Sequence, residues 1–374
     1  MTSASLARVN WWANPMNPTT FAVIGASGWR GQFFLRIARE LPELFRVTGL
    51  MSRDAATREA LTREWNLPTF FDLDGLLRER PQFVVISVPW AASPELLREL
   101  AAREMPVLAE TPPAPDLEGL TALHQLTVEG ARIQVAEQLQ FRPLHAARIA
   151  LAQSGRLGRI SQAQVSVAHG YHGINLLRRY LDVDFENVTI AARSFESPIV
   201  QGAGRGGPPQ AEKIVNASQT LASFDFGDRL GVFDFTGSQY FGWIRASRTL
   251  VRGERGEITD KKVRVLTDFR TPVEMDLVRR DAGHDDDLRA LHHQGITLGD
   301  EWIYRNPFAP GRLSDDEIAV ATCLQKMGEY VEGGPDFYSL AQASQDHYLS
   351  LLMEEAIESG QPVKSTSQVW SGSL

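Results

Sequence analysis

The chain has 374 residues, of which 43% are hydrophobic and 22% are charged, and its formal net charge is −8. This length is typical of two domains in a globular protein, and the acidic charge argues against a nucleic acid or an anionic membrane surface as partner. The single cysteine, Cys323, excludes an internal disulfide and a cysteine-based metal site, and we expect it to be buried in a helix.

The N-terminal residues 1–18 form an irregular arm that contains the adjacent Trp11 and Trp12. Two neighbouring tryptophans are costly to leave in water, so we expect the arm to pack on its own domain or on a partner subunit. The sequence shows neither a signal-peptide pattern nor an apolar run of 18 residues, which predicts a cytoplasmic protein without a transmembrane helix.

The next segment places a short apolar strand, Phe21–Gly25, directly before an amphipathic helix, Gln32–Leu41. The turn between them has the glycine spacing G-x-x-G-x-x-G, one residue longer than the usual G-x-G-x-x-G. Glycines let the backbone approach phosphate groups, and a helix start offers free N–H groups, so the turn indicates a dinucleotide site. A plain strand–turn–helix with convenient glycines is the alternative. The turn residues that we expect to bind the cofactor are Gly25, Ser27, Gly28, Trp29, Arg30 and Gly31.

Up to about residue 136, short strands continue to alternate with helices. This alternation predicts a parallel, doubly wound sheet, in which ligands lie beyond the carboxyl ends of the strands. The next strand ends in Ser52-Arg53-Asp54; an arginine can pair with a 2′-phosphate, which favours NADP. NAD stays possible, because Asp54 either contacts the ribose or only caps the following helix. Further strands are expected at 46–51, 69–71, 83–88, 106–109 and 132–136, and helices at 55–65, 73–80, 94–104 and 117–128.

After Arg142 the pattern changes to longer strand-like runs, which fit a largely antiparallel sheet. A capping box at Ser314 predicts a helix to about Val331, and a last helix is expected at 339–359, closed by Gly360. This last helix is expected to pack back near the first domain. A helix is also expected at 145–154, strands at 161–168, 188–193, 219–226, 230–240, 247–252 and 262–267, and loops or insertions at 201–209 and 280–299.

Short motifs along the chain, taken in order, carry a family resemblance. They are Gly25–Gly31, Val84–Pro89, Pro106–Pro112, Val135–Gln138 with Phe141–Pro143, Ser154–Ile160, Gly253–Gly256 and Gly360–Val363. In this order and spacing the chain resembles the Gfo/Idh/MocA family of NAD(P)-dependent oxidoreductases over nearly its whole length. The resemblance implies an NAD(P)-binding Rossmann domain at 1–140, followed at 141–374 by an α+β domain with a large open, mostly antiparallel sheet. It also implies a homo-oligomer, a dimer or tetramer, formed through that sheet.

The resemblance places the active site between the two domains and implies further cofactor contacts. Trp90 would cover the cofactor or merely fill a surface crevice, and Glu110 would reach the nicotinamide ribose or carboxamide. Gln138 and Arg142 lie at the domain junction, where they would bind ligand or serve the interdomain contact. Ser93 stands where members often have a histidine and is expected to cap the next helix. Besides Ser52 and Arg53 at the end of the second strand, the cofactor residues that the resemblance adds are Val88, Pro89, Trp90, Glu110 and Gln138.

Thr111 occupies the position of the family's usual lysine, which donates a proton or binds the substrate hydroxyl. A threonine hydroxyl is a poor acid near neutral pH, so Thr111 can only orient a substrate. No lysine precedes Lys213, and therefore no close neighbour in the sequence replaces the missing one. This departure implies a divergent mechanism.

The segment His169-Gly170-Tyr171-His172 supplies the other chemical candidates. By position His172 matches the family histidine that acts beside the lysine, and histidine suits general acid–base work near neutral pH. His169 and Tyr171 would supply a second proton donor; the alternative is a polar loop that caps a helix. No acidic partner completes a metal site, so no metal is expected. Tyr240, Trp243 and Arg245 are expected on the substrate side, and His292 and His293 in a solvated insertion.

The sequence thus predicts an NADP(H)-dependent oxidoreductase that transfers hydride to or from a carbonyl, hydroxyl or imine carbon of a small sugar-, polyol- or imine-like substrate. His172 would be its proton donor or acceptor. Two alternatives stay open: a catalytically silent dinucleotide sensor, and an enzyme that uses the cofactor only transiently, as in epimerisation or glycoside cleavage.

Overall fold

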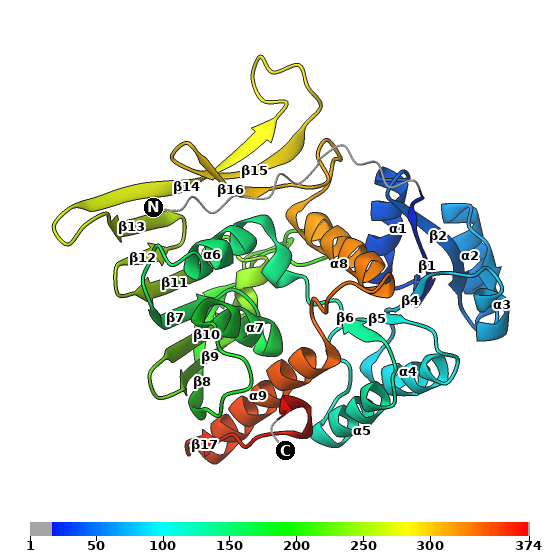
Figure 1. Cartoon of the computed structure of the whole chain (residues 1–374), viewed down its shortest axis with the longest axis horizontal. Helices are drawn as coiled ribbons and strands as arrows, with labels where there is room; N and C mark the ends of the chain where they lie inside the picture. The colour runs from blue at the N-terminus through cyan, green and yellow to red at the C-terminus, as the bar shows by residue number, and fades with distance from the viewer. Residues whose placement is uncertain (1–16, 373–374) are drawn as a thin grey trace.

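The computed structural model describes residues 17–372, which form two sheets with helices packed around and between them (Figure 1). Trp11, Trp12 and most of the N-terminal arm lie outside the described residues. Within the described chain, no helix is both long and apolar enough to cross a membrane.

The first sheet is parallel and doubly wound, as predicted. Its strands are β1 (Thr19–Ile24), β2 (Phe45–Met51), β3 (Thr69–Phe70), β4 (Phe83–Ile86), β5 (Val107–Ala109) and β6 (Ile133–Val135), in the order β3-β2-β1-β4-β5-β6. Its helices are α1 (Gly31–Glu40), α2 (Ala55–Trp65), α3 (Leu73–Leu77), α4 (Ser93–Ala101) and α5 (Leu117–Val128). Apolar side chains of α1 and α2 pack on one face of the sheet, and those of α3, α4 and α5 on the other.

Local capping signals set where several of these helices begin. Asp54, Asp72 and Asp116 each accept a hydrogen bond from the backbone N–H three residues later, at 2.7, 2.8 and 2.8 Å. The prediction that Ser93 caps the next helix is wrong, because Ser93 is the first residue of α4 and its buried side chain makes no capping bond. The turn η1 (Trp90–Ala92) runs directly into α4, so no extended residue stands before the helix.

The second sheet is large, open and mostly antiparallel, with β7 and β10 as its parallel pair. Its order is β16-β15-β14-β13-β12-β11-β7-β10-β9-β8-β17. The helices α6 (Pro143–Gln153) and α7 (Gly170–Leu181) lie beside it (Figure 1). The strands are β7 (Ile160–Ser166), β8 (Thr189–Val200), β9 (Ile214–Asp225), β10 (Leu230–Thr236), β11 (Arg248–Gly253), β12 (Gly256–Thr259), β13 (Lys262–Leu266), β14 (Pro272–Ala282), β15 (His292–Leu298), β16 (Glu301–Arg305) and β17 (Val363–Lys364).

The segment 280–299, expected to be a loop or insertion, instead holds the end of β14 and all of β15. Exposed charged side chains on both faces of β14, such as Arg279 and Arg280, remove the apolar–polar alternation by which a strand is predicted from sequence. His293, expected in solvent, is only 2% exposed, and its Nδ1 lies 2.7 Å from Oδ1 of Asp281. His293 is therefore buried with a hydrogen-bond partner, Asp281, on the neighbouring strand β14.

Two late helices connect the sheets. The predicted capping box of Ser314 and Glu317 opens α8 (Asp315–Val331), which lies on the same face of the first sheet as α1 and buries Cys323. The final helix, α9 (Leu340–Ser359), begins after the capping side chain of Ser339 and contacts α7 and β8 as well as α5 and β6. A segment from the end of the chain thus completes the layer that covers the first sheet.

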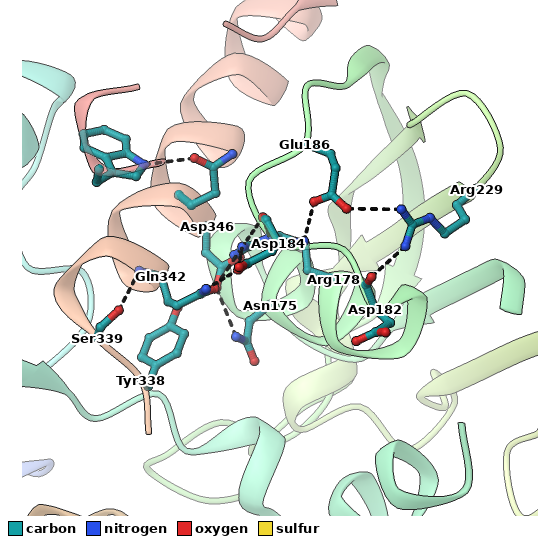
Figure 2. A network of polar contacts seen from close by, with 12 residues as sticks. Asn175, Arg178, Asp182, Asp184, Glu186, Arg229, Tyr338, Ser339, Gln342 and Asp346 are labelled. Carbon is teal, nitrogen blue, oxygen red and sulfur yellow. Dashed lines mark hydrogen bonds and ion pairs between the residues drawn. The ribbon is translucent and has the colours of Figure 1, made fainter. Parts of the chain in front are cut away.

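A buried polar network fixes α7 against α9 (Figure 2). The guanidinium of Arg178 on α7 pairs with Asp346 on α9, and their side chains are 3% and 1% exposed. Asp346 also accepts hydrogen bonds from Asn175 at 3.0 Å and from the hydroxyl of Tyr338 at 2.6 Å. Loss of either Arg178 or Asp346 would leave the other charge buried without its partner, which typically costs about 3–5 kcal/mol. The network therefore holds α7, whose first turn carries His172, in one position.

Candidate functional site

Three adjoining cavities follow the carboxyl ends of the strands of the first sheet. The strand-edge cavity, about 320 Å³, lies at the ends of β1 and β2 and is lined by Gly25 and Arg53. The turn cavity, about 350 Å³, lies against Gly28 and the end of β4. The central cavity, about 780 Å³, extends from the glycine turn to the start of α7 at His172. Their arrangement matches the position where a doubly wound sheet binds its ligand.

The glycine turn is shaped by two glycines that the fold requires and one that it does not. Gly25 has a φ of +91°, and a Cβ atom there would lie 2.0 Å from the carbonyl oxygen of Ser87. A Cβ on Gly31 would lie 2.4 Å from the carbonyl oxygen of Gly25. At Gly28, by contrast, the nearest protein atom would be 3.4 Å away, and this residue lines the turn cavity. The open side of Gly28 leaves room for close approach by a ligand.

Unpaired N–H groups surround that opening. The backbone N–H of Gly28 donates to the carbonyl oxygen of Gly25 at 3.1 Å, and that of Gln32 donates to the carbonyl oxygen of Gly28 at 3.2 Å. The backbone N–H groups of Trp29, Arg30 and Gly31 find no acceptor in the described chain. Helix α1 has no acidic residue in its first turn and no side-chain cap. Free N–H groups at the positive end of a helix suit a phosphate, so this turn fits a dinucleotide pyrophosphate.

The strand-edge cavity carries charges of both signs. Arg53 lines it and forms no ion pair with a described residue, while Glu95, Glu99 and Asp54 line it as well. Asp54 accepts the N–H of Thr57 at 2.7 Å, and the side chain of Thr57 together with this capping bond lowers the pKa of the Asp54 carboxyl. Asp54 therefore does cap α2, while Ser52 and Arg53 stand beside it at the cavity.

One wall of the central cavity comes from the first sheet. Arg30 and Glu110 form an ion pair across it, with Nε 3.3 Å from Oε1. Burial opposes the charge on Arg30, but Glu110 outweighs this effect and raises the pKa of the guanidinium. Thr111 lines the cavity beside them, and no lysine is among the described residues that do so. The position of the missing family lysine is therefore not filled by a lysine from later in the chain.

The other wall holds a buried carboxylate–histidine pair, Glu137 and His172. Glu137 follows β6, is fully buried, and places Oε2 2.5 Å from Nδ1 of His172; its Oε1 accepts the N–H of Leu139 at 3.0 Å. A carboxylate can only accept, so Nδ1 carries the hydrogen and Nε2 is left as the free nitrogen. Sequence reasoning missed Glu137 as a chemical residue, because its partner lies 35 positions away and the junction motif gives no sign of it.

His169 and Tyr171 lie close to this pair. The His169 and His172 rings are edge-to-face, with centroids 4.9 Å apart, and the Tyr171 ring lies 4.4 Å from that of His172. Nδ1 of His169 lies 2.5 Å from the hydroxyl of Tyr240. Desolvation in this cluster, with a smaller effect from His172, lowers the pKa of His169 to about 4. Burial also raises the pKa of Tyr171, so at neutral pH both groups are uncharged.

The remaining predicted residues divide between the cavities. Trp90, half exposed, lines both the turn cavity and the central cavity. Gln138 lines the central cavity, and its buried Oε1 has no partner among residues 17–372. Arg142, at the same cavity, pairs with Asp316 of α8 at 3.4 Å. Residues placed elsewhere are Val88 and Pro89 at the turn cavity, Ser27 exposed on the turn, Trp243 in a separate cavity beside β8 and β9, and Arg245 outside all of these.

Comparison with known proteins agrees with this architecture. Residues 19–137 match the model of the GFO_IDH_MocA family, described as an oxidoreductase family with an NAD-binding Rossmann fold. Comparison with curated proteins gives no significant match.

Solved structures similar to this chain are oxidoreductases. Levoglucosan dehydrogenase in complex with NADH has a TM-score of 0.67 and 14% identity, over 94% of this chain and 100% of that chain. An Agrobacterium radiobacter oxidoreductase in complex with NAD+, L-tartaric acid and magnesium has a TM-score of 0.66 and 15% identity, over 93% and 98%. The scyllo-inositol dehydrogenase of Lactobacillus casei has a TM-score of 0.63 and 14% identity, over 93% and 98%. At these identities the likeness shows the fold.

Proposed function

We propose that this chain, whose residues 19–137 belong to the Gfo/Idh/MocA oxidoreductase family, transfers hydride between a nicotinamide dinucleotide and a small substrate. The reacting substrate carbon would be a carbonyl, hydroxyl or imine carbon. The observation that carries the proposal is His172, which lines the same cavity as the glycine turn and is held from behind by the buried carboxylate of Glu137. An acid–base residue beside a dinucleotide turn is the minimum that such a reaction needs.

The cofactor would be held by residues of the first sheet. The free N–H groups of Trp29, Arg30 and Gly31 would bind the pyrophosphate, and Glu110 and Gln138 would hold the nicotinamide end. When bound, the nicotinamide supplies or accepts the hydride. The chain's own residues then have to orient the substrate, exclude water and handle one proton.

His172 is the proposed proton donor or acceptor. Its free Nε2 takes the proton of a substrate hydroxyl during oxidation and returns it during reduction. Glu137 keeps Nδ1 protonated and stabilises the positive charge that forms on the ring, as an acidic partner does in other His-based sites. Because the ring edge of His169 and the ring of Tyr171 pack against His172, the imidazole is held in one orientation.

The missing lysine gives Thr111 a limited role. Its hydroxyl orients the substrate, together with Tyr171 and the His169–Tyr240 pair on the opposite side. One proton relay, through His172, then serves the reaction. In this proposal the mechanism differs from that of family members whose lysine shares the proton transfer.

Sugars and polyols are the substrate class that the comparisons support best, with imines as a further option. The similar structures include dehydrogenases named for levoglucosan and for scyllo-inositol. The central cavity, of about 780 Å³, offers both hydroxyl and charged side chains, as a polyhydroxylated ligand requires.

We further propose NADP(H) as the preferred cofactor, because the guanidinium of Arg53 at the strand-edge cavity is free of carboxylate partners in the described chain. The three carboxylates at the same cavity would repel the negative charge of a 2′-phosphate, which favours NAD(H) as the alternative cofactor. Calorimetric titration with NADPH and with NADH tests this choice. Preference for NADPH in the wild type, lost in Arg53→Gln, supports it; preference for NADH that Arg53→Gln does not change contradicts it.

A homo-oligomer is proposed through the second sheet. Large apolar side chains are exposed around β8 and the turn η3 (Gly237–Tyr240), with Phe195 53%, Trp243 70% and Ile244 64% exposed. Exposed apolar clusters of this kind are typical of protein interfaces. Light scattering should show a dimer or tetramer, and Trp243→Glu should shift it toward the monomer.

The proposed activity is tested by a screen of sugars, polyols and cyclic imines, followed at the nicotinamide absorbance band with each dinucleotide. Turnover that His172→Ala removes supports the proposal. Dinucleotide binding without any turnover favours the sensor alternative. Product formation without net absorbance change, from an enzyme that retains its dinucleotide, favours transient use of the cofactor.

A further inference from the structure

A loop of the second sheet reaches the glycine turn of the first. The loop 201–213 joins β8 to β9, and its residue Arg205 lines both the turn cavity and the central cavity. The Arg205 guanidinium lies over the ring of Trp29, 4.6 Å from the ring centroid. Arg205 therefore spans the opening between the two sheets.

Arg205 also differs from the other arginines of the central cavity in its charge balance. Arg30 is neutralised by Glu110 at 3.3 Å, and Arg142 by Asp316 at 3.4 Å. Arg205 forms no ion pair with any residue between 17 and 372. The junction of the two cavities thus carries one uncompensated positive charge, which favours an anion at that point.

The loop presents Arg205 at the tip of a small turn. Gly204 and Gly207 exchange two backbone hydrogen bonds of 3.0 Å, and Gly207 has a φ of +107° that favours glycine. A Cβ atom added to Gly204, Gly206 or Gly207 would meet nothing within 4 Å, so these three positions of the tip face open space. The stacking of Arg205 on Trp29 joins the tip to the glycine turn of the first sheet.

We propose that Arg205 binds the dinucleotide pyrophosphate from the side opposite the glycine turn. The inference rests on the proposed function, because it needs a dinucleotide in the cleft. The N–H groups of Trp29, Arg30 and Gly31 would hold one side of the phosphates, and Arg205 would add a charge-assisted contact from the other. The ring of Trp29 aligns the guanidinium for that contact, since planar guanidinium groups stack on aromatic faces.

The test compares affinities for ADP-ribose, which has the pyrophosphate but no nicotinamide, and for adenosine, which has neither. Calorimetry is preferable to tryptophan fluorescence, because Arg205 touches Trp29 and its replacement alters that signal. Arg205→Gln should weaken ADP-ribose binding by about 10- to 100-fold and leave adenosine binding unchanged. Arg205→Lys should recover part of the loss.

Arg270→Gln is the matched control. Arg270 is an exposed arginine that lies 4.6 Å from the ring centroid of Phe269, and it lines neither cavity. Its replacement should change neither affinity. Equal ADP-ribose affinity in the wild type and in Arg205→Gln would overturn the proposed role of Arg205 and leave the proposed function untouched. Absence of ADP-ribose, NADH and NADPH binding in the wild type would overturn the proposed function together with this role.

Discussion

The two walls of the cleft are built by different means. The wall from the first sheet is made mostly of backbone: a glycine turn, free N–H groups and a helix start, all within residues 25–32. The opposite wall depends on a side chain brought from far along the chain, His172 of α7, which is held by the buried carboxylate of Glu137 at the end of β6 in the first sheet. A site that binds through the backbone can be encoded locally, whereas a site that moves a proton depends on packing.

The largest expected effect falls on the side-chain wall. His172→Ala should lower kcat by about 10²- to 10⁴-fold, because it removes the proposed proton relay. Dinucleotide affinity should stay near the wild-type value, since the first wall is intact. His284→Ala, at an exposed histidine outside the cleft, is the control. Unchanged turnover in His172→Ala would show that His172 is not the proton donor or acceptor.

Glu137→Gln tests whether the buried carboxylate acts through His172. The amide keeps the size of the side chain but replaces one carboxylate oxygen with an NH2 group, which only donates. An NH2 group facing Nδ1 of His172 favours the tautomer whose hydrogen is on Nε2. We expect kcat to fall on the order of 10²-fold with KM little changed. A fall in thermal stability without any change in kcat would point to a purely structural role for Glu137.

The backbone wall is tested by two glycine variants with opposite expected outcomes. Gly25→Ala should destabilise the fold by at least about 1–3 kcal/mol, because of its positive φ and the overlap with Ser87. Gly28→Ala should change the free energy of unfolding by less than about 1 kcal/mol but weaken dinucleotide binding about tenfold. Urea unfolding and calorimetry measure the two effects. Equal dinucleotide affinity in Gly28→Ala would contradict a close approach of the pyrophosphate.

The smallest expected effect concerns His169. Its pKa is about 4 in the folded state, below the ordinary value of 6.5, so between these pH values the unfolded chain binds more protons. Stability should therefore rise as the pH increases from about 4 to 6.5, and this contribution should be modest because the residue is partly open to solvent. Urea midpoints across this range should vary less in His169→Gln than in the wild type. Identical slopes would contradict the lowered pKa.

Much of the first domain's fold was predictable from the sequence. The alternation of apolar strands and amphipathic helices located every strand of the first sheet, and the helices expected at 55–65 and 117–128 have the limits observed for α2 and α5. The resemblance to the Gfo/Idh/MocA family agrees with the family match at residues 19–137, and the expected large, mostly antiparallel second sheet is present. By contrast, the strand pair around His293 was missed, because solvent-facing charges on β14 conceal its alternation.

The sequence by itself determined the glycine turn, the absence of a lysine at Thr111 and the candidacy of His172, because each depends on neighbouring residues or on a single position. Only the tertiary structure decided that Glu137 holds His172, that His169 faces Tyr240, and that α8 returns to cover the first sheet. The physical reason is separation along the chain. Contacts between residues far apart in sequence are fixed by how the two sheets and α7 pack, and no local pattern records that packing.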